Sequence, residues 1–271
     1  MNNSAKNLDS SNSSNSSNRI EETFKKNKKA FIAFITGGDP DIETTEQLII
    51  AMANSGVDII EIGIPFSDPI AEGPIIQAAD ERALSAGCTV DQLFEMTKKL
   101  RKKLDIPLLF MTYINPIFAY GVEKFMDQCA SCGIDGIIVP DLPYEEKDEL
   151  AYCTQKGIKL ISLIAPTSQE RITTIAKEAE GFLYCVSSLG VTGVRSEITT
   201  NVAEMISQVK KITDIPCAIG FGISTPSQAA EMAKLSDGVI IGSALVSIIA
   251  QHGKNSVGPL VEFVKEIRGV V

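Results

Sequence analysis

The strongest constraint on the fold is an alternation of short, apolar, β-branched segments with longer amphipathic segments, which begins near residue 30 and continues to the end of the chain. Such alternation predicts βαβ units and therefore a parallel sheet. The segments expected to be strands are Ala30–Thr36, Val57–Ile64, Pro107–Tyr113, Gly136–Pro140, Lys159–Ala165, Phe182–Ser187, Pro216–Gly222 and Gly238–Gly242. Helices are expected at Thr44–Ser55, Ile75–Ser85, Val90–Leu104, Val122–Cys132, Glu145–Gln155, Gln169–Glu180, Asn201–Ile212, Pro226–Leu235 and Val257–Ile267, with a shorter one at Ala244–Ala250.

Eight such units predict an α/β fold of one particular kind, a (β/α)8 TIM barrel. Residues 19–271 suit one such barrel, and no Pro/Gly/Ser-rich linker divides them. A doubly wound open sheet is the alternative, but no GxGxxG follows the first strand and the winding has no obvious point of reversal. We therefore expect a single catalytic domain with its chemistry at the carboxyl ends of the strands.

The first eighteen residues, Met1–Asn18, are mostly Asn and Ser, with Leu8 as the one large apolar residue after Met1. A segment of this kind buries too little surface to offset its ordering entropy, so a disordered tail is expected. It also lacks the apolar core of a secretory signal.

Charge and cysteine content narrow the classes of partner. The net charge is -9 and the basic residues are scattered, which argues against a nucleic-acid partner. The longest apolar stretch, Gly238–Ala250, is too short to cross a bilayer. The six cysteines are interpreted as reduced thiols of a soluble, cytoplasmic protein, and Cys129 and Cys132 as packing residues of a helix rather than a zinc or redox site.

One acidic residue stands where an apolar parallel strand should have none. Glu61 lies inside the segment Val57–Ile64. Burying a carboxylate without a partner costs several kcal/mol of folding free energy. Near the carboxyl end of a barrel strand, Glu61 is a candidate acid/base group with a raised pKa. The alternative is a structural carboxylate that accepts hydrogen bonds from backbone amides.

The loop after this strand, Pro65–Pro74, contains three prolines and two acids, Asp68 and Glu72. Loops at this end of a barrel often carry function, so both acids are candidates. Either could instead form a turn or cap the following helix.

Glycines gather after the last three strands, at Gly190 and Gly193, at Gly220 and Gly222, and at Gly242 followed by Ser243. Barrels commonly bind phosphate where the last two strands meet a short extra helix, through backbone N–H groups and the positive end of that helix. We therefore predict a phosphate site in this corner, although glycine pairs can also be simple turn residues.

Missing residue types restrict the mechanism. No lysine lies at the carboxyl end of a strand, which removes the nucleophile of a Schiff-base lyase. The chain has one histidine and no metal-ligand spacing near a strand end, so no metal is expected. Carboxylates remain as the acid/base groups.

These residues carry a resemblance to a known family. The run Glu61–Pro69 through Gln77, the segment Tyr184–Gly193 and Gly220-Phe221-Gly222 resemble the tryptophan synthase alpha chain over about residues 19 to 268. Further matching motifs are Thr36–Pro40, Asn115-Pro116, Pro140–Pro143 and Gly242-Ser243.

The resemblance implies retro-aldol cleavage of indole-3-glycerol phosphate to indole and glyceraldehyde 3-phosphate. It assigns acid/base catalysis to Glu61, binding of the indole N–H to Glu72, and orientation of Glu61 to Tyr184. Position 72 departs from the family, in which Asp is commoner, and the extra methylene puts the placement of the carboxylate in doubt.

The resemblance also implies binding residues and a partner. The indole pocket would be lined by Phe34, Ile76, Met111 and Ile138, and the phosphate held by Gly193, Phe221, Gly222, Gly242 and Ser243. Asp68 and Thr192 would close loops over the substrate, while Arg195 is either a phosphate contact or a solvent-facing side chain. A beta chain would dock on Asn115, Pro116, Asp141 and Pro143 to give an αββα complex, with pyridoxal phosphate in the beta chain and no cofactor in this one.

Three rival functions remain open from the sequence. The chain could be another phosphate-binding barrel, such as an isomerase or synthase of the same pathway, or an allosteric activator that has lost cleavage through Glu72. It could also be a free-standing lyase that works without a beta chain.

Overall fold

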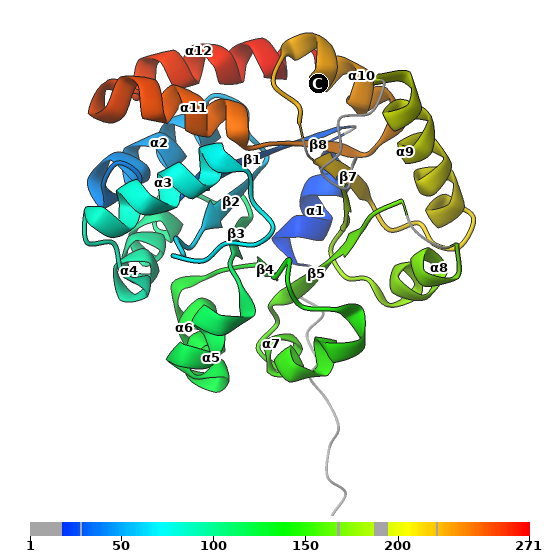
Figure 1. Cartoon of the computed structure of the whole chain (residues 1–271), viewed down its shortest axis with the longest axis horizontal. Helices are drawn as coiled ribbons and strands as arrows, with labels where there is room; N and C mark the ends of the chain where they lie inside the picture. Colours follow the sequence, from blue (N-terminus) through cyan, green and yellow to red (C-terminus); the bar gives the residue numbers. More distant parts are fainter. Residues whose placement is uncertain (1–17, 28, 167–168, 187–194, 221) are drawn as a thin grey trace, which may run out of the picture.

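The computed structural model describes residues 18–27, 29–166, 169–186, 195–220 and 222–271, with the backbone alone for 195–201. Parallel strands close into a barrel in sequence order, and helices surround it (Figure 1). The TIM-barrel prediction is therefore confirmed. The strands are β1 Ala30–Thr36, β2 Ile59–Gly63, β3 Leu108–Met111, β4 Gly136–Ile138, β5 Lys159–Ile164, β6 Leu183–Val186, β7 Cys217–Gly220 and β8 Gly238–Ile241.

The outer ring consists largely of helices at the expected positions. They are α2 Ile42–Asn54, α3 Pro74–Ser85, α4 Val90–Arg101, α6 Val122–Cys132, α8 Gln169–Glu178, α9 Arg195–Lys210, α10 Pro226–Leu235, α11 Ser243–His252 and α12 Val257–Arg268, with the 3-10 turn η2 Gly253–Asn255 between the last two. The expected helix Glu145–Gln155 is instead a 3-10 helix, η1 Tyr144–Leu150, followed by the short α7 Tyr152–Gln155.

Alternate residues of each strand face opposite sides of the barrel wall. Phe31, Ala33 and Ile35 of β1 pack outward in one apolar cluster with residues of α2. Ile32 faces inward, in a cluster that includes Ile59 of β2. Because side chains alternate along a strand, Glu61 falls on the same inward face as Ile59, two residues earlier.

A helix that the sequence did not predict, α1 Arg19–Lys26, closes the amino end of the barrel (Figure 1). Ile20 is fully buried there, and the rings of Phe24 and Phe182 lie 5.6 Å apart. Asn18, assigned above to the tail, caps the helix: its Oδ1 accepts from Ile20 N at 2.9 Å. Residues 1–17 of the predicted tail lie outside the described residues.

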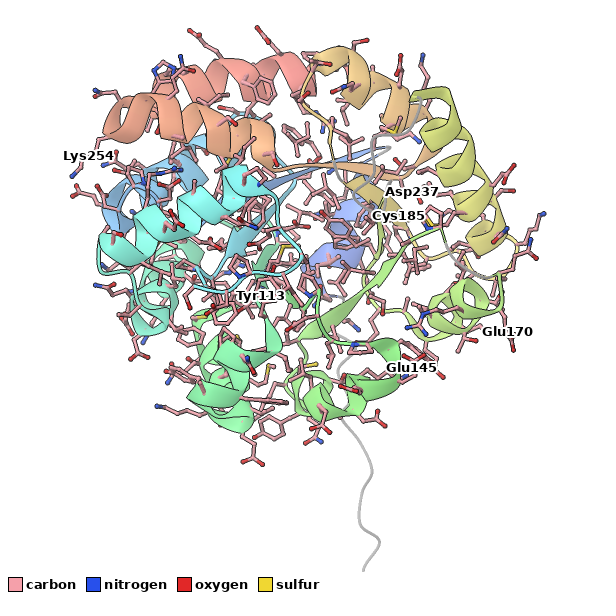
Figure 2. All side chains as sticks on the ribbon, viewed as in Figure 1. Tyr113, Glu145, Glu170, Cys185, Asp237 and Lys254 are labelled. Carbon is pink, nitrogen blue, oxygen red and sulfur yellow. The ribbon has the colours of Figure 1, made fainter. Side chains whose placement is uncertain are left out.

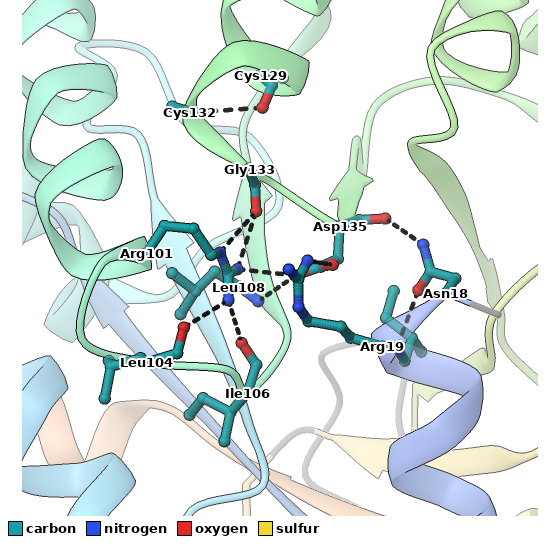
Figure 3. A network of polar contacts seen from close by, with 11 residues as sticks. Asn18, Arg19, Arg101, Leu104, Ile106, Leu108, Cys129, Cys132, Gly133 and Asp135 are labelled. Carbon is teal, nitrogen blue, oxygen red and sulfur yellow. Dashed lines mark hydrogen bonds and ion pairs between the residues drawn. The ribbon is translucent and has the colours of Figure 1, made fainter. Parts of the chain in front are cut away.

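Buried polar contacts fix this end of the molecule. The Asp135 carboxylate accepts from Arg19 at 2.8 Å and from Arg101 at 2.9 Å (Figure 3). Arg101 also donates to the backbone carbonyls of Leu104, Ile106 and Gly133. The network therefore ties α1 and α4 to the start of β4 and leaves the opposite end of the barrel for function.

A second unpredicted helix, α5 Ile114–Tyr120, follows directly on the expected strand Pro107–Tyr113. Seven residues are too few for helical periodicity to show in the sequence. Pro116 lies in the first turn of α5, where its missing N–H removes no helical hydrogen bond. The helix places Asn115 and Pro116 beside the carboxyl end of β3.

Candidate active site

Glu61 is buried without a hydrogen bond. Its register partners are Phe34 on β1 and Leu109 on β3, and its side chain has no exposed surface. Neither carboxylate oxygen has a hydrogen-bond partner among the described residues. Asp58, just before the same strand, contrasts with it because its carboxylate accepts from Asn27, from the backbone N–H of Phe31 and from Arg268. The alternative of a structural Glu61 carboxylate satisfied by amides therefore finds no contact to support it.

Burial alone raises the pKa of Glu61 to about 8. At neutral pH the group is therefore mostly a neutral acid. Burial also raises the pKa of Tyr184, on β6, well above its usual value, and the neighbouring Glu61 carboxylate raises it further. Tyr184 remains a hydroxyl at any physiological pH, able to donate a hydrogen bond toward an ionised Glu61.

Glycines at the strand ends make room for the aromatic side chains of the site. A Cβ at Gly220 would lie 2.5 Å from the Tyr184 hydroxyl, and one at Gly63 would lie 2.7 Å from the Phe34 ring. A side chain at either position would displace these rings. Gly220 and Gly63 are thus packing partners of Tyr184 and Phe34.

Hydrogen bonds at two adjacent residues hold the loop between β2 and α3. The hydroxyl of Tyr113, which is labelled in Figure 2, accepts from Ala71 N at 2.9 Å. Gln77 Nε2 donates to the carbonyl of Glu72 at 2.8 Å. Gly73 is the N-cap of α3 and makes no side-chain capping bond, so Glu72 does not cap this helix. Asp68 is exposed and accepts from Ser67 Oγ, whereas its expected partner Thr192 lies outside the described residues.

A cavity of about 1410 Å³ opens at the carboxyl end of the barrel and continues beneath η1 and α8. The predicted catalytic, indole-pocket and phosphate residues that line it are Phe34, Glu72, Ile76, Met111, Tyr184, Gly222, Gly242 and Ser243. Ile138 is not among the lining residues; it is fully buried in the barrel interior beside Leu109. Glu61 likewise lies outside the lining, so it has to turn past its neighbours to meet a molecule in the cavity.

The expected phosphate corner lies in the wall of this cavity. Helix α11 starts at Ser243 with Gly242 as its N-cap, and its first internal hydrogen bond runs from Val246 N to Gly242 O. The N–H groups of the first turn are therefore available to an anion. Gly222 has a φ of 76° and no described atom within 4 Å of an added Cβ, so its backbone is open. Phe221 and Gly193 lie outside the described residues.

Comparison with known proteins agrees with this geometry. The family model described as tryptophan synthase alpha chain matches residues 20–268. The chain belongs to the tryptophan synthase alpha chain family. The resemblance stated from the sequence is therefore confirmed, and with it a lyase function in tryptophan biosynthesis.

Individual relatives match along almost their whole length. The tryptophan synthase alpha chain of Lacticaseibacillus casei is 46% identical over 254 residues, covering 93% of this chain and 95% of the relative. That of Thermoanaerobacter sp. (strain X514) is 48% identical over 258 residues, covering 93% and 97%. The crystal structure of tryptophan synthase subunit alpha from Legionella pneumophila str. Paris superposes with a TM-score of 0.85 at 38% identity, covering 93% of this chain and 98% of that one.

The residues expected to meet a beta chain lie in α5 and just after β4, where Asp141 and Pro143 line the cavity. Asn115 and Pro143 are exposed, and Pro116 is partly exposed. Asp141 is different, because its Oδ1 accepts from Ile114 N at 3.0 Å and so supports the start of α5. Two apolar side chains that the sequence did not single out are also exposed: Ile70, in the cavity lining, with 80% of its surface exposed, and Phe118, on α5, with 47%.

In the part of the chain that the structure describes, no three His, Cys, Asp or Glu side chains gather as a metal site. The six cysteines are buried free thiols, and Cys132 Sγ donates to the carbonyl of Cys129. Among the described helices none has the length and apolar character needed to cross a membrane.

Sequence reasoning missed two functional side chains at this end of the barrel, Tyr113 and Asp80. Tyr113 was counted as the end of a strand, and nothing local indicated that its hydroxyl would hold Ala71. Asp80 had a visible signal: it falls on the buried face of α3 with Ile76, Ala79 and Ala83. A carboxylate in an apolar helical stripe is as unusual as Glu61 in its strand.

Proposed function

We propose that this chain cleaves indole-3-glycerol phosphate into indole and glyceraldehyde 3-phosphate, with Glu61 as the acid/base group. The observation that carries the proposal is the inward-facing Glu61 carboxyl, which has no hydrogen-bond partner among the described residues and whose pKa burial raises to about 8. A group protonated at neutral pH and close to ionising can both give and take a proton.

The reaction adds one proton to the indole ring and removes one from the glycerol hydroxyl, so one such group can serve both transfers. Glu61, as the neutral acid, gives a proton to C3 of the indole ring, and its carboxylate then takes the proton of the glycerol hydroxyl as the carbon–carbon bond breaks. The ring leaves as indole and the remainder as the aldehyde. Tyr184 stabilises the Glu61 carboxylate formed in between by donating its hydroxyl, which requires both side chains to turn toward the substrate.

Glu72 and the glycine corner would hold the two ends of the substrate. Glu72 lines the cavity from the loop between β2 and α3, where its carboxylate can accept the indole N–H and stabilise positive charge on the ring. Gly222, Gly242 and Ser243 offer backbone N–H groups at the start of α11 for the phosphate. Apolar walls from Phe34, Ile76 and Met111 would take the indole between them.

We propose further that a beta chain containing pyridoxal phosphate docks on the rim and receives the indole, with no cofactor in this chain. Support comes from the exposed Asn115 and Pro143 and from two exposed apolar side chains: Ile70, which lines the cavity, and Phe118, which follows Asn115 by three residues on α5. Aromatic side chains such as Phe118 are enriched in protein interfaces. The reduced state of six buried thiols favours a cytoplasmic location.

Steady-state assays of cleavage, with and without a beta chain, test the proposal directly. We expect a slow rate for the isolated chain and a faster one with the partner, because docking orders the loop that carries Glu72. Full cleavage without activation would identify a free-standing lyase. Activation of the beta chain without any cleavage would identify an allosteric subunit that has lost its chemistry.

A further inference from the structure

Asp80 is a buried acid whose nearest polar groups include a second acid. Its residue is 4% exposed, on the face of α3 that packs toward the barrel. The groups acting on its carboxyl are the Glu72 carboxyl, the backbone N–H of Phe66 and the hydroxyl of Thr36. Glu72 and Phe66 belong to the β2–α3 loop, and Thr36 ends β1. The Asp80 carboxyl therefore lies against the loop that carries Glu72 to the cavity.

No cation offsets this pair of acids in the described part of the chain. The closest arginine along α3 is Arg82, and its guanidinium is engaged by Asp39 through two hydrogen bonds of 2.8 Å. The other titratable groups nearby are the Tyr113 hydroxyl and Asp141, whose charges act on Tyr113 together with those of Glu72 and Asp80. Two buried carboxylates without a cation repel strongly, so the pair lowers its energy by keeping one proton between them.

The proton belongs mainly to Asp80. Burial and the Glu72 carboxylate raise the pKa of Asp80 to about 8. Burial also raises the pKa of Glu72, but the contact with Asp80 lowers it. Asp80 is also the more deeply buried of the two residues, since Glu72 is partly exposed, so the proton that the pair keeps is assigned to Asp80.

The loop hydrogen bonds fix the backbone at Glu72 but do not hold its carboxylate. Tyr113 and Gln77 fix the backbone at Ala71 and Glu72, whereas the buried oxygen Oε2 of Glu72 has no hydrogen-bond partner among the described residues. Asp80 stands on a helix anchored by the Arg82–Asp39 pair, so its position is rigid. A neutral Asp80 supplies an O–H that can hold this carboxylate.

We propose that Asp80 is a positioning residue for the cleavage reaction: its buried carboxyl donates a hydrogen bond to the Glu72 carboxylate. This inference rests on the proposed function, because it assumes that Glu72 accepts the indole N–H. The hydrogen bond keeps Glu72 ionised and limits the freedom of its longer side chain. When Asp80 ionises, the donor is lost and repulsion turns the Glu72 carboxylate away.

The proton can be observed on the full chain without catalysis. Protein labelled with 13C at the Asp side-chain carboxyl separates Asp80 from Glu61, which titrates in the same pH range. The Asp80 signal is assigned by its absence in Asp80→Asn. We expect it to titrate near pH 8 and to move at least one pH unit lower in Glu72→Gln, about a tenfold change in proton affinity. Titration below about pH 5, or no change in Glu72→Gln, overturns the inference.

Activity measurements separate positioning from simple packing. Asp80→Leu keeps the branching of the side chain but removes the donor, and we expect kcat to fall about 10- to 100-fold with a smaller change in KM. Asp80→Asn restores a permanent donor, so it should recover most of the lost kcat at pH 7. Equal losses in both variants, each folded by circular dichroism, would mean a packing role and overturn the inference. If Asp80→Leu does not fold, the titration alone decides.

The two proposals fail in different ways. A wild-type chain that cleaves the substrate while Asp80 titrates near its usual pH removes the positioning role and leaves the proposed function. A chain that never cleaves, alone or with a beta chain, while Asp80 titrates near pH 8 and responds to Glu72→Gln, removes the proposed function and leaves the shared proton.

Discussion

Replacing Glu61 with Gln changes the proton chemistry of the site and removes a charge that the fold accommodates poorly. The amide has nearly the same volume, so the barrel should close as before, but it cannot carry a proton to and from the substrate. We expect Glu61→Gln to abolish cleavage. We also expect the variant to be more stable than the wild type in mildly alkaline solution.

The size of this gain follows from the burial of Glu61. Between pH 4.5 and about 8 the folded protein holds a proton that the unfolded chain releases, so the free energy of unfolding falls as pH rises. The interval is about 3.5 pH units at about 1.4 kcal/mol each, which sets a ceiling of about 5 kcal/mol above pH 8. Water entering from the adjoining cavity reduces the penalty, so we expect about 2–4 kcal/mol.

Urea unfolding followed by circular dichroism from pH 5 to pH 9 measures the effect. The difference between Glu61→Gln and the wild type should grow through this range and level off above pH 8. Glu149→Gln, at an exposed position of η1, is the matched surface control. A difference that stays constant with pH would show that Glu61 ionises freely in the folded protein, and normal turnover in the variant would remove it from catalysis.

Four further outcomes are expected. Glu72→Ala should lower kcat about 100-fold, whereas Glu72→Asp should retain activity; a silent Glu72→Ala would show that this carboxylate does not act on the ring. Gly222→Asp should raise KM roughly tenfold or more, since a like charge beside the phosphate costs on the order of 1–2 kcal/mol, and an unchanged KM would place the phosphate elsewhere. Arg101→Met should lower the free energy of unfolding by about 3–5 kcal/mol in urea, because it leaves Asp135 and three carbonyls short of a donor (Figure 3). Asn115→Ala should reduce activation by a beta chain without changing the isolated rate; equal losses in both rates would place Asn115 outside the interface.

Much of the fold could be read from local patterns. Near-continuous apolar strands separated by amphipathic segments predicted the closed barrel, and eight of the expected segments contain β1 to β8. Two helices, α1 and α5, were not predicted. The signal for α1 is a single cap at Asn18 followed by few apolar residues, and α5 is shorter than the window in which periodicity shows. Both are stabilised by contacts with distant segments, at Asp135 and at Asp141, that no local pattern encodes.

Part of the site could likewise be predicted from local sequence patterns. The inward direction of Glu61 follows from period-two alternation within one strand, and the cost of burying a carboxylate marks it without any knowledge of its neighbours. The family motifs placed Glu72, Gly222 and Ser243 at the same end of the barrel, because the carboxyl ends of parallel strands share one edge.

Which side chains of different segments contact one another became known only from the tertiary structure. Asp80 lies eight residues beyond Glu72, on the buried face of α3, and its carboxyl interacts with that of Glu72; Arg82 of the same helix pairs with Asp39 beyond the end of β1. Tyr113 reaches Ala71 across 42 residues because the strands that precede them, β3 and β2, pair side by side. The sequence by itself determined the elements and the face on which each side chain lies, because these depend on periodicity within a segment. The shared proton, the hydroxyl that holds the loop and the clearance at Gly220 depend on distances between segments, which barrel closure alone sets.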